Sequence, residues 1–310
     1  MTEHLLSAEP THSRWNRSLP PRLVVDSGDL IHVECVDSSG SQVKPGMLLS
    51  EFLEIDRTRI HALTGPIAVR GAQPGDVLEI EILDVVHKGW GWTSTVEGLG
   101  FLKDRFREPS LFLWELDGPQ TVSLAPAIVP LRPFCGVMGV APAQDGEFRT
   151  RPPGPFGGNL DVRELCAGAK LYLPVFNPGA LFSLGDGHAA QGDGEVCING
   201  IECPLDVSIR LSLHKAQPLA GPLVESAEPK GPPADAWIVV ESGEDAMETA
   251  RNATSRMVDL LASRWGFSEV CAYVLCSVAM NLRLSQVVNE PMVTVSAAIS
   301  KGILPARRLF

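Results

Sequence analysis

Short runs of alternating apolar and polar residues recur along the chain and predict a protein built mainly of β-strands. In the run 207–214, VSIRLSLH, an aliphatic residue occupies every second position and mostly polar residues lie between them. A period of two is typical of antiparallel strands that bury one face. Strands are predicted at 22–26, 30–35, 77–86, 128–134, 170–176, 207–214, 236–241 and 292–299.

Near the C-terminus the apolar residues change to helical spacing. The segment 244–266 predicts a helix that ends at Gly266, and Ser268 is suited to cap a second helix over 268–280. The first helix is expected to pack through one apolar face, formed by Met247, Ala250, Met257, Leu260, Leu261 and Trp265. Together with the strands, this predicts a mainly β (α+β) fold of antiparallel sheets with a helical pair near the C-terminus.

Proline and glycine mark two connections between these elements. Residues 145–159 form a Pro/Gly-rich loop, and 226–235, SAEPKGPPAD, resembles a linker. The expected organisation is a β-rich region over 1–225 that carries most of the site. A second region over 226–310 contains the linker, two helices and a closing strand, and the two regions are expected to pack as one compact unit.

Composition narrows the classes of function. The 310-residue chain is 45% hydrophobic and 20% charged, which is ordinary for a soluble globular protein. Its net charge of −11 argues against nucleic-acid partners, and no run approaches the roughly 18 apolar residues of a membrane span. The N-terminus does not resemble a signal peptide. Seven cysteines without a C-x-x-C pair favour reduced thiols, so we expect a cytoplasmic protein.

The stretch 179–202, GALFSLGDGHAAQGDGEVCINGIE, gathers ionisable side chains among glycines. Apolar, strand-like runs flank the charges at 170–176 and 196–202, so we expect a buried site and not a solvated turn. An imidazole among carboxylates suits zinc or another divalent cation, and also general acid–base chemistry. The ionisable residues are Asp186, His188, Asp193, Glu195 and Glu202.

Other segments could bring groups to the same place. His61 precedes a turn, and Asn159 and Asp161 follow a glycine pair. Asp76 lies in a P-G-D turn ahead of an alternating strand, where its carboxylate can accept from its own backbone, so we leave it out of the site.

Four segments of the chain resemble the acetamidase/formamidase family of amide hydrolases. They occur in the family's order between Trp15 and Val295, and the most specific is GDGHAAQGDGE; the segments are HALTGPIAVRGAQPGDVLEIEILDV, PLRPFCGVMGVAPA, GPFGGNLDVRELCAGAKLYLPVFNPGALFSLGDGHAAQGDGEV and LRLSQVVNEPMVTV. The resemblance implies hydrolysis of a small carboxamide to carboxylate and ammonia, a fold with jelly-roll or β-sandwich parts, and a homo-oligomer of two or more chains. The chain has Met280-Asn281 where the family usually carries Gly-Asp, which leaves the choice of amide open.

The resemblance also implicates individual residues, namely His61, Asn159, Asp161, His188, Asp193, Glu195 and Glu202. We expect a divalent metal, with zinc favoured, to be held by His61, Asp161, His188 and Asp193. Glu195 or Glu202, together with His188, would move protons to and from the reacting water and the leaving nitrogen. Asn159 is expected to bind the substrate, and backbone amides near Gly187, Gly192 and Gly194 to stabilise the oxyanion.

Two other readings of the sequence stay open. A cysteine nucleophile, Cys135 or Cys197 with Lys170 nearby, could serve the same reaction. Outside enzymology, the chain could be a β-sandwich module that binds a small molecule or a metal such as calcium. Trp90 and Trp92 could line an entrance to the site or belong to the core.

Overall fold

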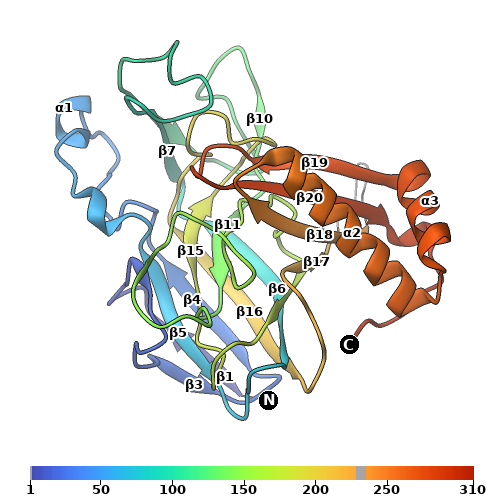
Figure 1. Cartoon of the computed structure of the whole chain (residues 1–310). Helices are drawn as coiled ribbons and strands as arrows, with labels where there is room; N and C mark the ends of the chain where they lie inside the picture. Colours follow the sequence, from blue (N-terminus) through green and yellow to red (C-terminus); the bar gives the residue numbers. More distant parts are fainter. Residues whose placement is uncertain (1, 228–234) are drawn as a thin grey trace.

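The computed structural model describes residues 2–227 and 235–310, and its strands form two large sheets that enclose a common core (Figure 1). Neighbouring strands of the larger sheet are antiparallel, except for the parallel pair at one edge, β1 and β4. Its nine strands have the order β1 (Glu3–Leu6), β4 (Leu30–Cys35), β16 (Leu205–His214), β6 (Val77–His87), β14 (Lys170–Pro174), β17 (Leu223–Glu225), β18 (Ala236–Gly243), β20 (Val293–Ser300) and β19 (Met280–Gln286).

The smaller sheet has five strands and carries the charged stretch at its centre. Its order is β13 (Gly157–Asn159), β11 (Phe134–Gly139), β15 (Phe182–His188), β5 (Leu63–Val69) and β3 (Leu23–Val25). Three two-stranded pairs complete the β structure: β2 (Arg14–Trp15) with β12 (Phe148–Arg149), β7 (Trp90–Thr95) with β8 (Ser110–Glu115), and β9 (Gln120–Thr121) with β10 (Val129–Pro130).

The apolar pattern explains how the strands pack. In β16, Val207, Ile209 and Leu211 are buried in the core between the two sheets, as their alternation predicts. β18 is apolar at successive positions because both of its faces are covered: Ile238 points into the core between the sheets, whereas Trp237 packs under the C-terminal helices.

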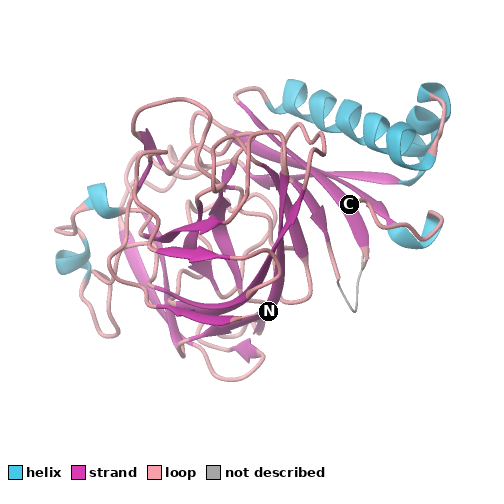
Figure 2. Cartoon of the chain, turned by 90° about the horizontal axis from the view of Figure 1, so that it is seen from below, coloured by secondary structure: helices cyan, strands magenta, loops and turns pink. Residues whose placement is uncertain are grey.

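Two helices cover the C-terminal part of the nine-stranded sheet (Figure 2). α2 (Ala246–Trp265) begins after Asp245, whose side chain accepts from the amide of Glu248, and ends at Gly266, whose φ of 76° suits a residue without a Cβ. α3 (Glu269–Ala279) is capped by Ser268 as predicted. Three shorter helices are α1 (Leu49–Phe52), η1 (Arg57–Arg59) and η2 (Lys301–Ile303).

The predicted mainly β class with a C-terminal helical pair is confirmed. Met247, assigned to the buried face of the first helix, is instead 64% exposed, because the buried face of α2 is formed by Thr249, Ala253, Met257 and Leu261. Strand β17 pairs with β18 across the predicted boundary at 225/226, so both regions contribute to one sheet. Most of the predicted linker, residues 228–234, lies outside the described residues. None of the described helices combines the length and hydropathy needed to cross a membrane.

The charged stretch differs from its prediction in two places. Residues 182–188, which are absent from the predicted strands, form the central strand β15, whereas 196–202, predicted to be strand-like, consists of turns with isolated bridges. The reason is that SLGDGH lacks apolar alternation, so its strand state depends on pairing with β11 and β5.

Candidate active site

Strand β15 presents Asp186 and His188 on one face, two residues apart, against the neighbouring strand β11. The pairing of β15 with β11 places Gly136 opposite Asp186. A Cβ on Gly136 would lie 2.5 Å from Asp161 Oδ1 and 2.7 Å from Asp186 Oδ2, so only glycine leaves room for these carboxylates. The φ of Asp186 is 56°, an uncommon conformation for a residue other than glycine.

Asp161 approaches from the end of β13 and meets this face. Its φ is 50°, and its backbone amide donates to the carbonyl of Gly136 at 3.2 Å. Asn289 Nδ2 donates to Asp161 Oδ2 at 2.6 Å, whereas Asp161 Oδ1 has no hydrogen-bond partner. The side chain is thus tethered on one oxygen and open on the other.

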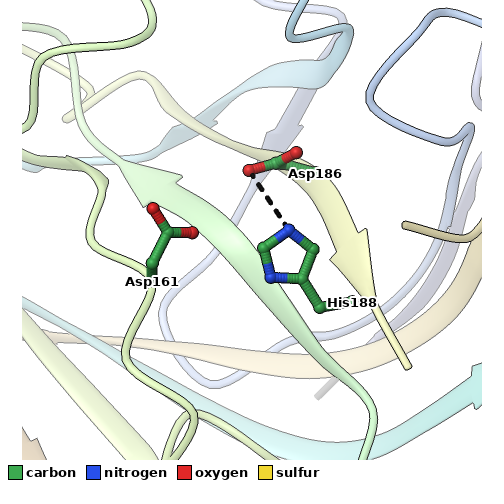
Figure 3. A group of neighbouring side chains, drawn as sticks. All are labelled: Asp161, Asp186 and His188. Atoms are coloured by element: carbon green, nitrogen blue, oxygen red, sulfur yellow. Dashed lines mark ion pairs between the residues drawn. The ribbon is translucent and has the colours of Figure 1, made fainter. Parts of the chain in front are cut away.

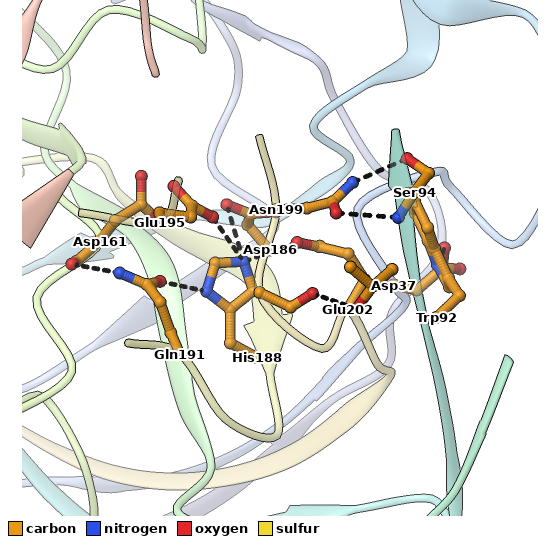
Figure 4. Close-up of polar contacts among 12 residues, drawn as sticks. Asp37, Trp92, Ser94, Asp161, Asp186, His188, Gln191, Glu195, Asn199 and Glu202 are labelled. Carbon is orange, nitrogen blue, oxygen red and sulfur yellow. Dashed lines mark hydrogen bonds and ion pairs between the residues drawn. The ribbon is translucent and has the colours of Figure 1, made fainter. Parts of the chain in front are cut away.

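His188 is contacted at both ring nitrogens (Figure 4). Gln191 Nε2 donates to the carbonyls of Asp161 and Ser285, at 2.9 and 3.3 Å, which turns its Oε1 toward His188 Nδ1 at 2.8 Å. Because Oε1 can only accept, we assign the proton to Nδ1. Nε2 then faces the carboxylates of Glu202, Glu195 and Asp186 at 2.8, 3.7 and 3.8 Å.

We call Asp161, Asp186, Glu195 and Glu202, together with His188, the carboxylate cluster. All five residues are buried, Glu195 the least so at 6% exposed. Burial, and then the neighbouring Asp186, raises the pKa of Asp161 to about 7, against the pull of His188. Burial also raises the pKa of Asp186 to about 6 and that of Glu195 well above its usual range.

At His188, burial and the neighbouring carboxylates shift the pKa in opposite directions. Burial by itself would lower the pKa of its imidazole, but the carboxylates of Glu202 and Asp186 outweigh it and raise this pKa well above 6.5. The cluster therefore holds more negative charge than its own residues neutralise, a state that protons or a bound cation would relieve.

The donor set fits a divalent metal ion. Asp161 Oδ1, Asp186 Oδ1, Glu202 Oε2 and His188 Nε2 are buried without a hydrogen-bond partner. Two groups of ligand atoms lie within 4.8 Å of one another, Asp161–Asp186–His188 (Figure 3) and His188–Glu195–Glu202. Carboxylate oxygens with an imidazole nitrogen suit zinc, manganese or iron. The hydrogen bond from Gln191 to the far side of the imidazole is the support that metal-ligating histidines generally have.

A cavity of about 60 Å³ leads to the cluster and is lined by Asp186, Glu195 and Glu202. Asn159 also lines it, with a buried Oδ1 that has no partner. His61 also lines the cavity. Burial lowers the pKa of its imidazole, although the carboxylate of Asp186 acts to raise it. The sequence left open whether Trp92 belongs to the core or lines the site. Trp92 is buried and also lines the cavity, so it does both.

Asp193, a predicted metal ligand, lies outside the cluster. Its carboxylate pairs with Arg163 at 3.1 Å and with Arg283 at 3.7 Å. These arginines and the turn after Gln191 hold it on the surface side, and Asp186 occupies the position by His188 that the sequence assigned to Asp193.

The three predicted glycines do not line the cavity either. Gly187 pairs with Cys135 in the sheet, and Gly194 donates its amide to Ser285 at 3.0 Å. An added Cβ on Gly192 would meet no atom within 4 Å. We therefore do not assign the oxyanion donors to these residues.

The sequence missed several groups around the cluster. Asp186 is one of the ionisable residues of the stretch 179–202, but the sequence assigned it no role in the site. Its spacing of two from His188 would have placed both on one strand face. Asn289 is 128 positions from Asp161, so no local pattern reveals it. Gln191 lies three positions after His188, which was the available signal.

The cysteine alternative finds little support in the geometry. A hydrogen bond with Cys35 and then burial raise the pKa of the Cys135 thiol, and burial raises that of Cys197. Lys170 Nζ is bonded to Glu79 at 2.7 Å in the nine-stranded sheet and does not line the cavity. A nucleophilic thiolate needs a lowered pKa, and neither cysteine has one.

The comparisons with known proteins agree on one family. The family model described as Acetamidase/Formamidase family matches residues 2–147 and 143–305. A formamidase of Methylophilus methylotrophus is 29% identical, and the match spans 66% of this chain and 64% of that protein.

Two solved structures share the fold over nearly the whole chain. The acetamidase of Bacillus halodurans is 33% identical with a TM-score of 0.89, over 96% of this chain and 98% of that one. A protein of Thermoanaerobacter tengcongensis described as a predicted acetamidase/formamidase is 31% identical with a TM-score of 0.90, over 98% of this chain and 97% of that one. This chain therefore belongs to the Acetamidase/Formamidase family and is a hydrolase of amide carbon–nitrogen bonds.

Proposed function

We propose that the protein hydrolyses a short carboxamide to its carboxylate and ammonia, at the carboxylate cluster. One observation carries the proposal: buried carboxylates with unpaired oxygens surround His188 at the end of a small cavity. Amides are poor electrophiles, so their hydrolysis needs an activated water and a proton for the departing nitrogen.

The cavity favours a short substrate. Its volume of about 60 Å³ corresponds to roughly four or five water positions, enough for an amide the size of formamide or acetamide. The unpaired Oδ1 of Asn159 is the acceptor that a substrate NH₂ group requires. A bulky aryl amide would have to extend out of the cavity.

Glu195 is the proposed proton carrier between water and the leaving nitrogen. It lines the cavity, and burial raises the pKa of its carboxyl well above the usual range, a shift common among carboxyls that transfer protons in catalysis. Glu202 lies 2.8 Å from His188 Nε2 and is better placed to share a bound cation with that nitrogen.

A divalent metal, with zinc favoured, is the proposed cofactor, and Asp161, Asp186 and His188 would hold it. When bound, such an ion polarises a carbonyl and acidifies water. The unpaired oxygens of these two aspartates support this assignment. His61 lines the same cavity as Asp186, and burial lowers the pKa of its imidazole.

The test is ammonia release from formamide, acetamide, propionamide and indole-3-acetamide, before and after treatment with a chelator and with metals added back. We expect turnover of the short amides, its loss on chelation and its return with one metal. Turnover that is indifferent to metal but lost on thiol alkylation would contradict the metal mechanism and point to a cysteine.

Metal content gives a second readout that does not depend on turnover. Mass spectrometry of the purified protein should find about one equivalent of a divalent metal, and Asp186→Asn should lower it. Asp193→Asn is the matched control, because it removes a neighbouring carboxylate that lies outside the cluster. An equal loss in both variants would return Asp193 to the ligand set.

We also propose that the protein is a homo-oligomer. α3 exposes Val270, Tyr273 and Val278, at 73, 63 and 76%, beside the edge strand β19 with its exposed Leu282. An exposed apolar patch on the order of several hundred Å² usually marks an interaction site. A cytoplasmic location remains our proposal, supported by seven cysteines without disulfides.

A further inference from the structure

Two arginines, Arg57 and Arg151, line the same cavity and are more exposed than the buried carboxylates of the cluster. Within residues 2–227 and 235–310, neither guanidinium has a hydrogen-bond or ion-pair partner, although most arginines of this acidic chain do. The cavity is thus lined by buried carboxylates and by two more exposed cationic side chains.

Arg151 is held at the cavity by the residue before it. Thr150 is buried, and its Oγ1 accepts from the backbone amide of His61 at 3.2 Å and lies 3.3 Å from His61 Nδ1. The adjoining strand β12 pairs with β2. The segment directly before Arg151 is therefore tied to the cavity wall.

The surroundings of Arg151 oppose its charge. Burial, and after it the guanidinium groups of Arg149 and Arg57, lowers the pKa of Arg151, and the acidic Glu290 compensates only in part. A partly buried cation without a partner is costly, and a bound anion is the usual compensation. A guanidinium matches the planar carboxylate, with which it can form two parallel hydrogen bonds.

The cavity volume sets the size of the substrate that fits. The cavity holds roughly four or five water positions, which an amide group and one or two carbons fill. A charged group attached to such an amide would lie among the lining residues, which include both arginines. A simple neutral amide would leave both guanidinium groups without a partner.

We propose that the substrate is a short amide that also carries a carboxylate, with its amide at the carboxylate cluster and its carboxylate on Arg151 and Arg57. This inference rests on the proposed amide hydrolysis and names its substrate class. For malonamate, a short compound of this class, water adds to the amide carbon and the C–N bond breaks. One malonamate and one water give one malonate and one ammonium ion.

The experiment compares two substrates of the same length and shape. Malonamate carries the carboxylate, and acetoacetamide replaces it by a neutral methyl ketone. The ratio of kcat/KM for malonamate to that for acetoacetamide is measured by ammonia release in wild type, Arg151→Gln, Arg151→Lys and Arg149→Gln. Arg149→Gln is the matched control, because it removes the same charge two residues earlier, in strand β12, without removing a group that lines the cavity.

We expect wild type to favour malonamate at least tenfold, mainly through a lower KM. Arg151→Gln should reduce the ratio tenfold or more, Arg151→Lys should keep part of it, and Arg149→Gln should change it less than threefold. A wild type that prefers acetoacetamide overturns the proposal. So does an Arg151→Gln variant that loses both substrates equally, which would mean that Arg151 only balances the charge of the cluster.

The same measurement separates this inference from the function on which it depends. If acetoacetamide and acetamide are hydrolysed but malonamate is not, the substrate class is wrong and amide hydrolysis stands. If wild-type protein with its metal restored releases ammonia from none of the three, the proposed hydrolysis of short amides is itself contradicted.

Discussion

At the scale of single residues, the side-chain amide of Gln191 positions His188, and three carboxylates face the other ring nitrogen. Gln191 accepts at Nδ1 and is itself fixed by two backbone carbonyls, so Nε2 is directed toward Glu202, Glu195 and Asp186. The acids around it share a second property: Asp161, Asp186 and Glu195 all have positive φ. Backbone conformations of this kind persist where the surrounding structure enforces them, and they concentrate at functional sites.

Replacing Glu195 by glutamine tests the proton carrier. The amide keeps the shape of the side chain but cannot move a proton, so kcat for acetamide should fall by about 10²–10⁴-fold. Ammonia release gives the rate, and thermal unfolding should show a melting temperature close to that of wild type. Full activity in Glu195→Gln would transfer the role to Glu202.

At the scale of elements, the site depends on two strands approaching closely at a glycine. In β11, Gly136 faces Asp186 of β15, and a side chain there would displace Asp161 and Asp186 together. The sequence motif RPFCGVMG contains this glycine, but only the strand register shows which carboxylates it admits.

Gly136→Ala should therefore damage the site more than the fold. We expect kcat/KM for acetamide to fall by at least tenfold and the content of bound metal to fall with it, because both aspartates must move. Gly192→Ala is the control: an added Cβ there meets no atom within 4 Å, and its rate should stay within threefold of wild type. If Gly192→Ala is the more damaging change, the glycine-rich segment has the direct role that its sequence suggested.

The turn before β6 gives a prediction about pH. Asp76 accepts from the amides of Gln73 and Ala216 and from Lys215 Nζ, which confirms the structural role that its P-G-D turn predicted. Burial opposes its ionisation, but the hydrogen bonds from Lys215, Ala216 and Gln73 outweigh burial and lower the pKa of Asp76.

Because the folded-state pKa lies below the unfolded value of about 3.9, Asp76 stabilises the fold above that pH, and its contribution is lost as the pH falls through the folded-state pKa. Asp76→Asn should destabilise the protein at pH 7 and less so at pH 3. Urea unfolding at the two pH values measures the difference. If the difference in unfolding free energy between Asp76→Asn and wild type is larger at pH 3 than at pH 7, the lowered pKa assigned to Asp76 is contradicted.

At the scale of the whole molecule, two opposed edges of the nine-stranded sheet differ in character. The β19 edge is extended by the apolar face of α3, whereas the other edge ends in the short strand β1, where Leu5 is an isolated exposed apolar residue. An unpaired edge strand beside an apolar helix face offers both hydrogen bonds and apolar area to a second copy of the chain.

Val278→Lys should weaken the oligomer by placing a charge in this patch. Size-exclusion chromatography with light scattering should show a larger fraction of single chains than in wild type at the same concentration. Leu5→Lys changes an equally exposed apolar residue at the opposite edge and should leave the mass unchanged. Dissociation by Leu5→Lys alone would move the interface to β1.

Local patterns were sufficient for part of the fold. The alternation in 207–214 predicted β16, and the residues that cap helices predicted the ends of α2 and α3, because caps and strand faces depend on near neighbours in sequence. They were insufficient for β15, whose glycines and charges have no strand pattern of their own. That segment is a strand because β11 and β5 pair with it on both sides.

The sequence by itself determined the fold class, the family and the segment that contains His188, because each of these is encoded in contiguous residues. The tertiary structure alone decided the membership of the site: Asp186 and not Asp193, Asn289 beside Asp161, and two arginines in the lining of the cavity. Asp186 and Asp193 are both acids next to glycine in one stretch, and what separates them is the strand that faces the first and the arginines that pair with the second. Such contacts join residues far apart in the chain, so no local pattern specifies them.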